Sequence, residues 1–163
     1  MKKTLAALLL ATTLALSACT GGAAPTPTPT AAAAMSVAEA GQYYLDTVCP
    51  TNSVGEALGT AYQAGDLEAF TAAAAAARDA YKEAGVRFGD ADVVWPDSVA
   101  GNIVVLRDAS IALAASYESL SQVTSLEEAN AIAFPDSADA SAASQAIRAD
   151  LELSSDPAVS CPQ

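Results

Sequence analysis

Histidine is absent from all 163 residues, and basic residues are scarce. Without an imidazole, the chain cannot build a Ser-His-Asp or Cys-His nucleophile, a His-ligated zinc site or a His proton shuttle. Seven Lys and Arg stand against 19 Asp and Glu, so the formal net charge is −12. A field of this sign opposes binding to nucleic acid, which requires basic groups to neutralise the phosphates. We therefore expect no nucleic-acid partner.

The motifs of nucleotide and nucleophile chemistry are missing as well. The sequence contains no P-loop, no G-x-G-x-x-G and no Ser-x-x-Lys, and Lys82 is the only lysine after the first three residues. The acidic loop at Asp90 and Asp92 lacks the ligand pattern of an EF-hand, because Val94 and Trp95 occupy ligand position five and glycine position six. We expect no cofactor, no metal site and no enzymatic activity. A carboxylate pair that meets only in the folded protein, as in glycosidases, stays open.

The first 19 residues have the organisation of an export signal. Lys2 and Lys3 precede the uncharged, apolar segment Thr4 to Leu16, whose 13 residues are too few to span a membrane as a helix. The segment ends in Leu16-Ser17-Ala18-Cys19, which resembles the lipobox of bacterial lipoproteins. The resemblance implies that residues 1–18 are removed and that the thiol of Cys19 carries a diacylglyceryl group. The protein would then be anchored by lipid on the extracytoplasmic face of the cell membrane. The alternative is an ordinary secretory signal that is cut nearby, with Cys19 a bystander.

Residues 19–34 are expected to form a tether. The Pro-Thr repeat from Pro25 to Thr30 favours the polyproline II conformation, at about 3.1 Å per residue, and the segment has no bulky apolar side chains with which to build a core. An alanine-rich domain behind a Pro-Thr tether resembles, in style, the small uncharacterised helical lipoproteins of high-GC Gram-positive bacteria.

Residues 35–163 are expected to form one folded domain, since 129 residues suffice for a single core. After loss of the two signal-peptide lysines, five basic side chains face all 19 acids, and the side-chain charge becomes −14. Cys49 and Cys161 remain in a compartment where disulfides persist, and we expect them to pair. Each precedes a proline, so both are predicted at helix ends. A redox or metal-binding pair is the alternative, although the chain has no C-x-x-C motif.

The domain is predicted to be all-α. Serine followed three residues later by glutamate marks capping boxes at Ser36, Ser53 and Ser125, and Asp66 offers another N-cap. Two segments, Trp95-Pro96-Asp97-Ser98 and Phe134-Pro135-Asp136-Ser137, share a Pro-Asp-Ser helix start. We expect a bundle of five to six helices closed by one disulfide. Its shorter helices are predicted at residues 36–48, 53–64 and 126–133, and a long C-terminal helix is predicted at residues 137–153.

Two apolar stripes at helical spacing identify the longest helices and their core faces. Both spacings alternate between three and four residues, as in helices that pack at shallow angles. The first stripe comprises Leu67, Phe70, Ala74, Ala77, Tyr81, Ala84 and Phe88; the second comprises Val99, Ile103, Leu106, Ser110, Leu113, Tyr117 and Leu120.

Aromatic residues supply the candidate contacts to a ligand or partner. Tyr43 and Tyr44 are adjacent on a predicted helix, so both cannot face the core, and one should reach a surface or groove. Trp95 lies in the longest loop, where it is expected to cover one end of the bundle or to take part in recognition. Tyr81 and Tyr117 fall within the core stripes, which indicates packing rather than binding.

The expected function follows from an anchor, a tether and an acidic domain without catalytic residues. We expect a non-enzymatic lipoprotein that contacts the membrane through acylated Cys19 and serves as a protein-interaction or structural module of the cell envelope, with an envelope protein as partner. The alternative is a carrier of an apolar or haem-like ligand held near Tyr43, Tyr44 and Trp95, since tyrosine can ligate haem iron.

Overall fold

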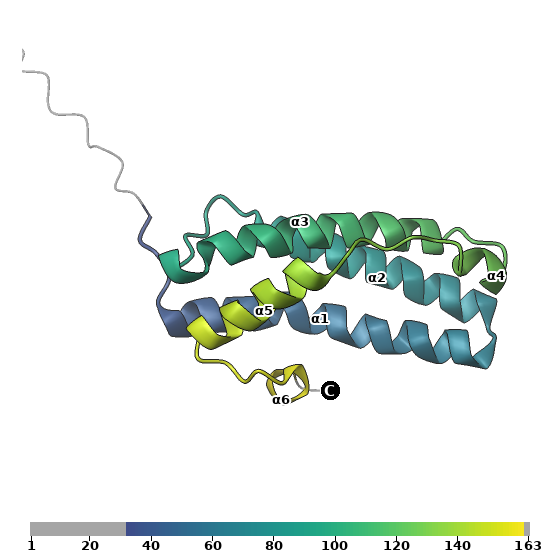
Figure 1. Ribbon diagram of the computed structural model, residues 1–163, viewed down its shortest axis with the longest axis horizontal. Helices are drawn as coiled ribbons and strands as arrows, with labels where there is room; N and C mark the ends of the chain where they lie inside the picture. The colour runs from purple at the N-terminus through teal and green to yellow at the C-terminus, as the bar shows by residue number, and fades with distance from the viewer. Residues whose placement is uncertain (1–31, 162–163) are drawn as a thin grey trace, which may run out of the picture. The chain divides into compact units, whose positions relative to one another are not determined.

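The computed structural model describes residues 32–161 (Figure 1). These residues form six helices joined by turns and loops, with no strands among them. The predicted all-α fold is therefore confirmed, as is its closure by one disulfide, between Cys49 and Cys161. The signal peptide, most of the tether and Cys19 lie outside the described residues. The helices are α1 (Val37–Ala64), α2 (Leu67–Phe88), α3 (Asp97–Leu120), α4 (Leu126–Ala129), α5 (Ala138–Asp150) and α6 (Pro157–Ser160).

Three long helices form the body of the domain. Helices α1, α2 and α3 lie alongside one another, with α2 packed extensively against both of the others (Figure 1). Helix α5 packs against α3 and lies over one half of the bundle, between α3 and α1 (Figure 1). It has only 13 residues, whereas the three long helices have 22 to 28. Helix α5 therefore takes the fourth place in the bundle but covers only part of the length of α1, α2 and α3.

Helix α1 is continuous, and the prediction of two helices separated at Pro50 was wrong. Pro50 has no N–H to donate to the carbonyl of Asp46 and normally breaks a helix. Here the chain continues through it, with the hydroxyl of Thr51 donating to the Val48 carbonyl at 2.7 Å. Ser53, predicted as an N-cap, lies inside the helix and donates to the Pro50 carbonyl at 3.0 Å. Packing of α1 along α2 outweighs the local cost of the proline.

The other helix starts follow the predicted capping chemistry to different degrees. Ser36 forms the full capping box with Glu39, and Asp66 accepts a hydrogen bond from the Ala69 N–H at 3.0 Å. Ser125 caps α4, but the carboxylate of its predicted partner Glu128 accepts from the N–H of Thr124 instead.

The two Pro-Asp-Ser segments are not equivalent in the structure. Helix α5 is preceded by Asp136, whose carboxylate accepts from the N–H of Ala138 at 2.9 Å. Helix α3 has no side-chain cap, because Asp97 already lies in its first turn and Pro96 occupies the N-cap position. The shared sequence therefore marks two helix starts without fixing a common cap.

The C-terminal part is more broken than predicted. The helix expected at residues 126–133 is the four-residue α4, and the one expected at 137–153 spans only Ala138–Asp150. Glu152 adopts a left-handed conformation, with φ 57°, and the Leu153 N–H donates to the Arg148 carbonyl at 2.8 Å. This is the Schellman arrangement that ends a helix and reverses the chain. It directs the following residues into α6, a helix that the sequence analysis did not predict, and to Cys161.

The two predicted stripes form most of the core. On α2 and α3, ten of their residues are buried: Phe70, Ala74, Ala77, Ala84, Phe88, Val99, Ile103, Leu106, Ser110 and Leu120. Four stripe residues are only half-buried: Leu67, Tyr81, Leu113 and Tyr117. Tyr81 and Leu113 line an open groove, described below, that α5 leaves uncovered.

Helix α3 is, within residues 32–161, the only helix long and apolar enough to cross a membrane by length and composition. It packs against α2 and α5 and contributes the buried residues Val99, Ile103 and Leu106 to the core. Core helices of folded domains satisfy the same criterion of length and composition.

Candidate functional site

A groove of about 350 Å³ lies between α1 and α5, with residues of α2 and α3 also lining it. It exists because α5 is too short to fill the fourth corner of the bundle. Its apolar surface includes Val48, Ala84, Leu106 and Leu113. A small volume lined by apolar side chains and a few placed polar groups is typical of sites for small ligands.

Four polar residues of the groove come from one face of α5 and its N-cap. Ser137, Ser141, Ser144 and Arg148 follow one another at spacings of four, three and four residues, so they share one side of the helix, and all four line the groove. The hydroxyls of Ser144 and Tyr44 are hydrogen-bonded at 2.8 Å, which joins α5 to α1. Although the chain has 19 acidic residues, none lines the groove.

Arg148 is the exceptional residue of this site. It is only 2% exposed, and its Cζ lies 5.6 Å from the centre of the Tyr44 ring. Its Nη1 donates to the Ser154 carbonyl at 2.9 Å and to the Ser160 hydroxyl at 3.3 Å, whereas the buried Nε has no hydrogen-bond partner. No carboxylate of the described residues forms an ion pair with it; the ion pairs found there involve Arg78 and Arg107.

A buried cation without a counter-ion is unfavourable. Removing a charged group from water costs several kcal/mol unless a partner compensates, and buried arginines are normally paired. Arg148 retains its charge under all ordinary conditions, because a guanidinium cannot lose its proton in a protein. The groove therefore contains a fixed, desolvated positive charge within a strongly negative domain.

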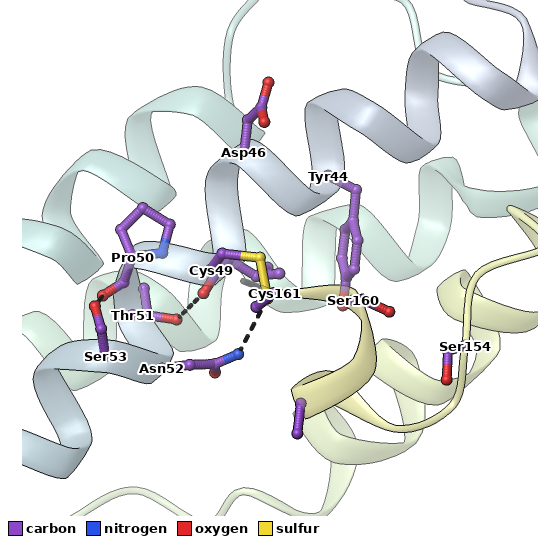
Figure 2. The surroundings of a disulfide bond; sticks show 12 residues. Tyr44, Asp46, Cys49, Pro50, Thr51, Asn52, Ser53, Ser154, Ser160 and Cys161 are labelled. Atoms are coloured by element: carbon purple, nitrogen blue, oxygen red, sulfur yellow. Dashed lines mark hydrogen bonds between the residues drawn. A yellow bond between two sulfur atoms is a disulfide. The ribbon is translucent and has the colours of Figure 1, made fainter. Parts of the chain in front are cut away.

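The disulfide joins α1 to the residue that follows Ser160 at the end of α6 (Figure 2). The Cα atoms of Cys49 and Cys161 lie 5.3 Å apart, and Asn52 Nδ2 lies 3.5 Å from the Cys161 sulfur. Cys161 lies at a helix end, as predicted, although the helix there, α6, was not predicted; Cys49 lies inside α1 rather than at a helix end. By tying α6 to α1, the disulfide places Ser160 against the guanidinium of Arg148.

The three predicted contact residues do not form one site. Tyr43 and Trp95 pack edge to face, with ring centres 5.5 Å apart, and the Arg87 guanidinium lies 4.7 Å from the Tyr43 ring centre. The Tyr43 hydroxyl donates to the Arg87 carbonyl at 3.3 Å. Trp95 is 8% exposed and belongs to the core, with its indole N–H unpaired. Only Tyr44 lines the groove.

Tyr81, on the groove surface, stacks on Tyr117 with ring centres 5.2 Å apart. Desolvation raises the pKa of both phenols. Both hydroxyls therefore stay neutral at physiological pH, and the groove gains no negative charge from them.

The structure gives little support to iron or carboxylate chemistry in the groove. The hydroxyls of Tyr43 and Tyr44 are both hydrogen-bonded, so each would have to be released before it could ligate haem iron. Within residues 32–161, no three Asp, Glu or Cys side chains gather as metal ligands would. In the predicted acidic loop, the Asp90 carboxylate accepts the N–H of Asp92 at 2.9 Å, which is a local turn contact.

Sequence analysis missed Arg148. In the helix predicted at residues 137–153, Ala140, Ala143, Ile147 and Leu151 were expected to face inward, and Arg148 lies between the last two, next to this face. Its burial was not expected, because arginine side chains are usually exposed.

Comparison of the chain with protein-family models, curated proteins and solved structures finds no significant match.

Proposed function

We propose that this protein is a lipid-anchored lipoprotein of the bacterial envelope, whose helical domain binds a small amphipathic ligand in the groove between α1 and α5. The observation that carries the proposal is Arg148, which is buried, has no ionic partner in the described structure and lines a largely apolar groove. A folded domain tolerates such a charge most readily when a ligand compensates it. The aromatic and aliphatic groove residues would hold the rest of the ligand.

The anchor rests on the lipobox-like segment that ends at Cys19. A Cys19→Ala variant expressed in a host that acylates lipoproteins should leave the membrane fraction, because the attachment site of the lipid is lost. The wild-type protein is the control, and retention of the variant in the membrane would contradict the anchor.

The groove is tested by blocking it. Native mass spectrometry of residues 35–163, purified under mild conditions, should detect a bound small molecule or saturable uptake from an envelope lipid extract. A Ser141→Trp substitution places a large ring at the groove and should abolish binding. An Ala142→Trp substitution adds the same ring at the next, exposed position of α5, which does not line the groove, and should leave binding intact. Equal binding by both variants would contradict the proposal.

A protein-interaction module is the second candidate, favoured by exposed apolar side chains on α2 and α3. Val86 is 63% exposed and Ile111 is 57% exposed, and Ile111 lies against Gly85, the residue that precedes Val86. Val104, two turns from Ile111 on α3, extends the same apolar surface. Crosslinking on intact cells should recover an envelope protein with the wild type and lose it with Ile111→Glu. Recovery unchanged by Ile111→Glu would contradict this surface as the interface.

A further inference from the structure

We infer that the ligand of the groove carries a single carboxylate head group, which is bound by the Nε–Nη2 edge of Arg148. This inference rests on the proposed ligand-binding function and adds the chemistry of the ligand. It follows from the donors that Arg148 leaves unused, from the charges around the groove and from the number of cations that the groove contains.

One edge of the Arg148 guanidinium, formed by Nε and Nη2, makes no hydrogen bond to the other described residues. A guanidinium has five N–H donors in a fixed plane, and a carboxylate pairs with two parallel donors on one edge. Here Nη1 is engaged by the Ser154 carbonyl and the Ser160 hydroxyl. Nε has no partner, and no hydrogen bond joins Nη2 to another described residue. These two atoms are the ones that bind a carboxylate side-on, and because Nε is buried, the neighbouring side chains must move aside for the ligand to reach it.

The structural contacts of Arg148 also fix its direction. The bonds from Nη1 hold the guanidinium against the turn after α5 and against α6, and its Cζ lies 5.6 Å from the centre of the Tyr44 ring. An arginine held in this way loses little further conformational entropy when it binds, which is the benefit of a preorganised site. The site would bind its ligand non-covalently, through a guanidinium that is already held in position.

The charge pattern of the groove selects an anion. Arg148 is the only charged residue among those that line it, and the lining otherwise consists of neutral polar and apolar side chains. An ammonium or guanidinium ligand would meet a like charge and no carboxylate. An uncharged ligand would leave Arg148 uncompensated.

The number of charges favours a singly charged head group, such as a carboxylate, over a phosphate monoester. One guanidinium supplies one positive charge, which a carboxylate neutralises. A phosphate monoester carries about −1.5 to −2 at neutral pH, and its excess charge would have no cationic partner in the groove. The domain as a whole is strongly acidic, so excess negative charge at the site would also be repelled by its surroundings.

The remainder of the ligand should be short and apolar. Val48, Ala84, Leu106, Ala109 and Leu113 offer an apolar surface within the groove, and the volume of about 350 Å³ is at the lower end of the range for ligand sites. A straight-chain carboxylate such as octanoate has both features and serves as a probe of defined chemistry.

The test compares four probes that share one chain: octanoate, 1-octanol, octylamine and octyl phosphate. Isothermal titration of residues 35–163 below the concentrations at which the probes aggregate should show octanoate binding at least tenfold more tightly than the other three. Equal affinity for octanol would refute the head-group inference and leave the proposed function intact. Tighter binding of the amine or the phosphate would refute it as well. Binding of none of the four would contradict the ligand-binding function itself.

Variants then locate the contact. Arg148→Lys keeps the charge but removes the planar fork, and it should weaken octanoate at least tenfold while changing octanol less than twofold. Arg107→Lys makes the same substitution at an arginine that does not line the groove and pairs with Asp108, so its octanoate affinity should stay within twofold of the wild type. Thermal melting establishes that each variant folds. An unchanged octanoate affinity in a folded Arg148→Lys variant would overturn the assignment, and the comparison of probes on the wild type decides the head group even if that variant does not fold.

Discussion

Removal of the disulfide should destabilise the domain strongly. Cys49 and Cys161 are separated by 112 residues, so the bond closes nearly the whole folded chain into one loop. In the chain-entropy model, a loop of this length restricts the unfolded state by about 5 kcal/mol. The reduced native state recovers part of this loss, because the four-residue α6 can detach from α1 while the three long helices stay packed. We therefore expect a net loss of about 3–5 kcal/mol.

The assay is thermal unfolding of residues 35–163, followed by circular dichroism, for the wild type and for a Cys49→Ala, Cys161→Ala double variant. For a domain of this size each kcal/mol moves the melting temperature by roughly 4 °C, so a decrease of about 12–20 °C is expected. Reductant should lower the melting temperature of the wild type to that of the double variant and leave the double variant unchanged. A decrease of less than about 4 °C, or two free thiols on unreduced protein, would refute the reasoning.

Two further predictions concern α1 and the helix caps. Pro50→Ala restores an N–H beneath the Asp46 carbonyl and should raise the free energy of unfolding by about 1–2 kcal/mol, as measured in urea, whereas lower stability would show that the proline is required for the path of α1. The pKa values of Glu39 and Glu128 are lowered, chiefly by a side-chain hydrogen bond from Ser36 and by the backbone N–H of Thr124 respectively. Because these carboxylates release protons more readily in the folded state, their stabilisation is present above about pH 4.5 and is lost as the pH falls through their folded pKa values. The stability difference between the wild type and a Glu39→Gln, Glu128→Gln variant should therefore shrink as the pH falls below 4.5; a difference that stays constant with pH would contradict this account.

The fold was predictable because its signals are local and repeated. The stripes of α2 and α3 place their core faces at regular spacing, and Ser36 and Asp66 cap their helices through contacts within four residues. Pro50 was misinterpreted because its cost is local, whereas the packing of α1 along α2 that outweighs it is tertiary. The Glu152 reversal was missed because a left-handed turn at a glutamate has no compositional signal, unlike one at glycine.

The candidate site was predicted less well, for a related reason. Adjacent tyrosines suggested a surface contact, and one of them, Tyr44, does line the groove. The groove itself depends on the length of α5 relative to the three other helices, which arises only when the elements are assembled. The unpaired state of Arg148 depends on the position of every acidic side chain in three dimensions, and periodicity along the chain carries no information about it.

The most direct test of the central claim is the NMR signal of the Arg148 side-chain Nε–H during titration with octanoate. The account predicts that this resonance, assigned by its absence in Arg148→Lys, shifts downfield and saturates with the same dissociation constant as calorimetry, because a carboxylate oxygen becomes its hydrogen-bond acceptor. The Nε–H of Arg107, which already pairs with Asp108 at 2.9 Å, should not move. Saturable octanoate binding without a change in the Arg148 signal would contradict the account.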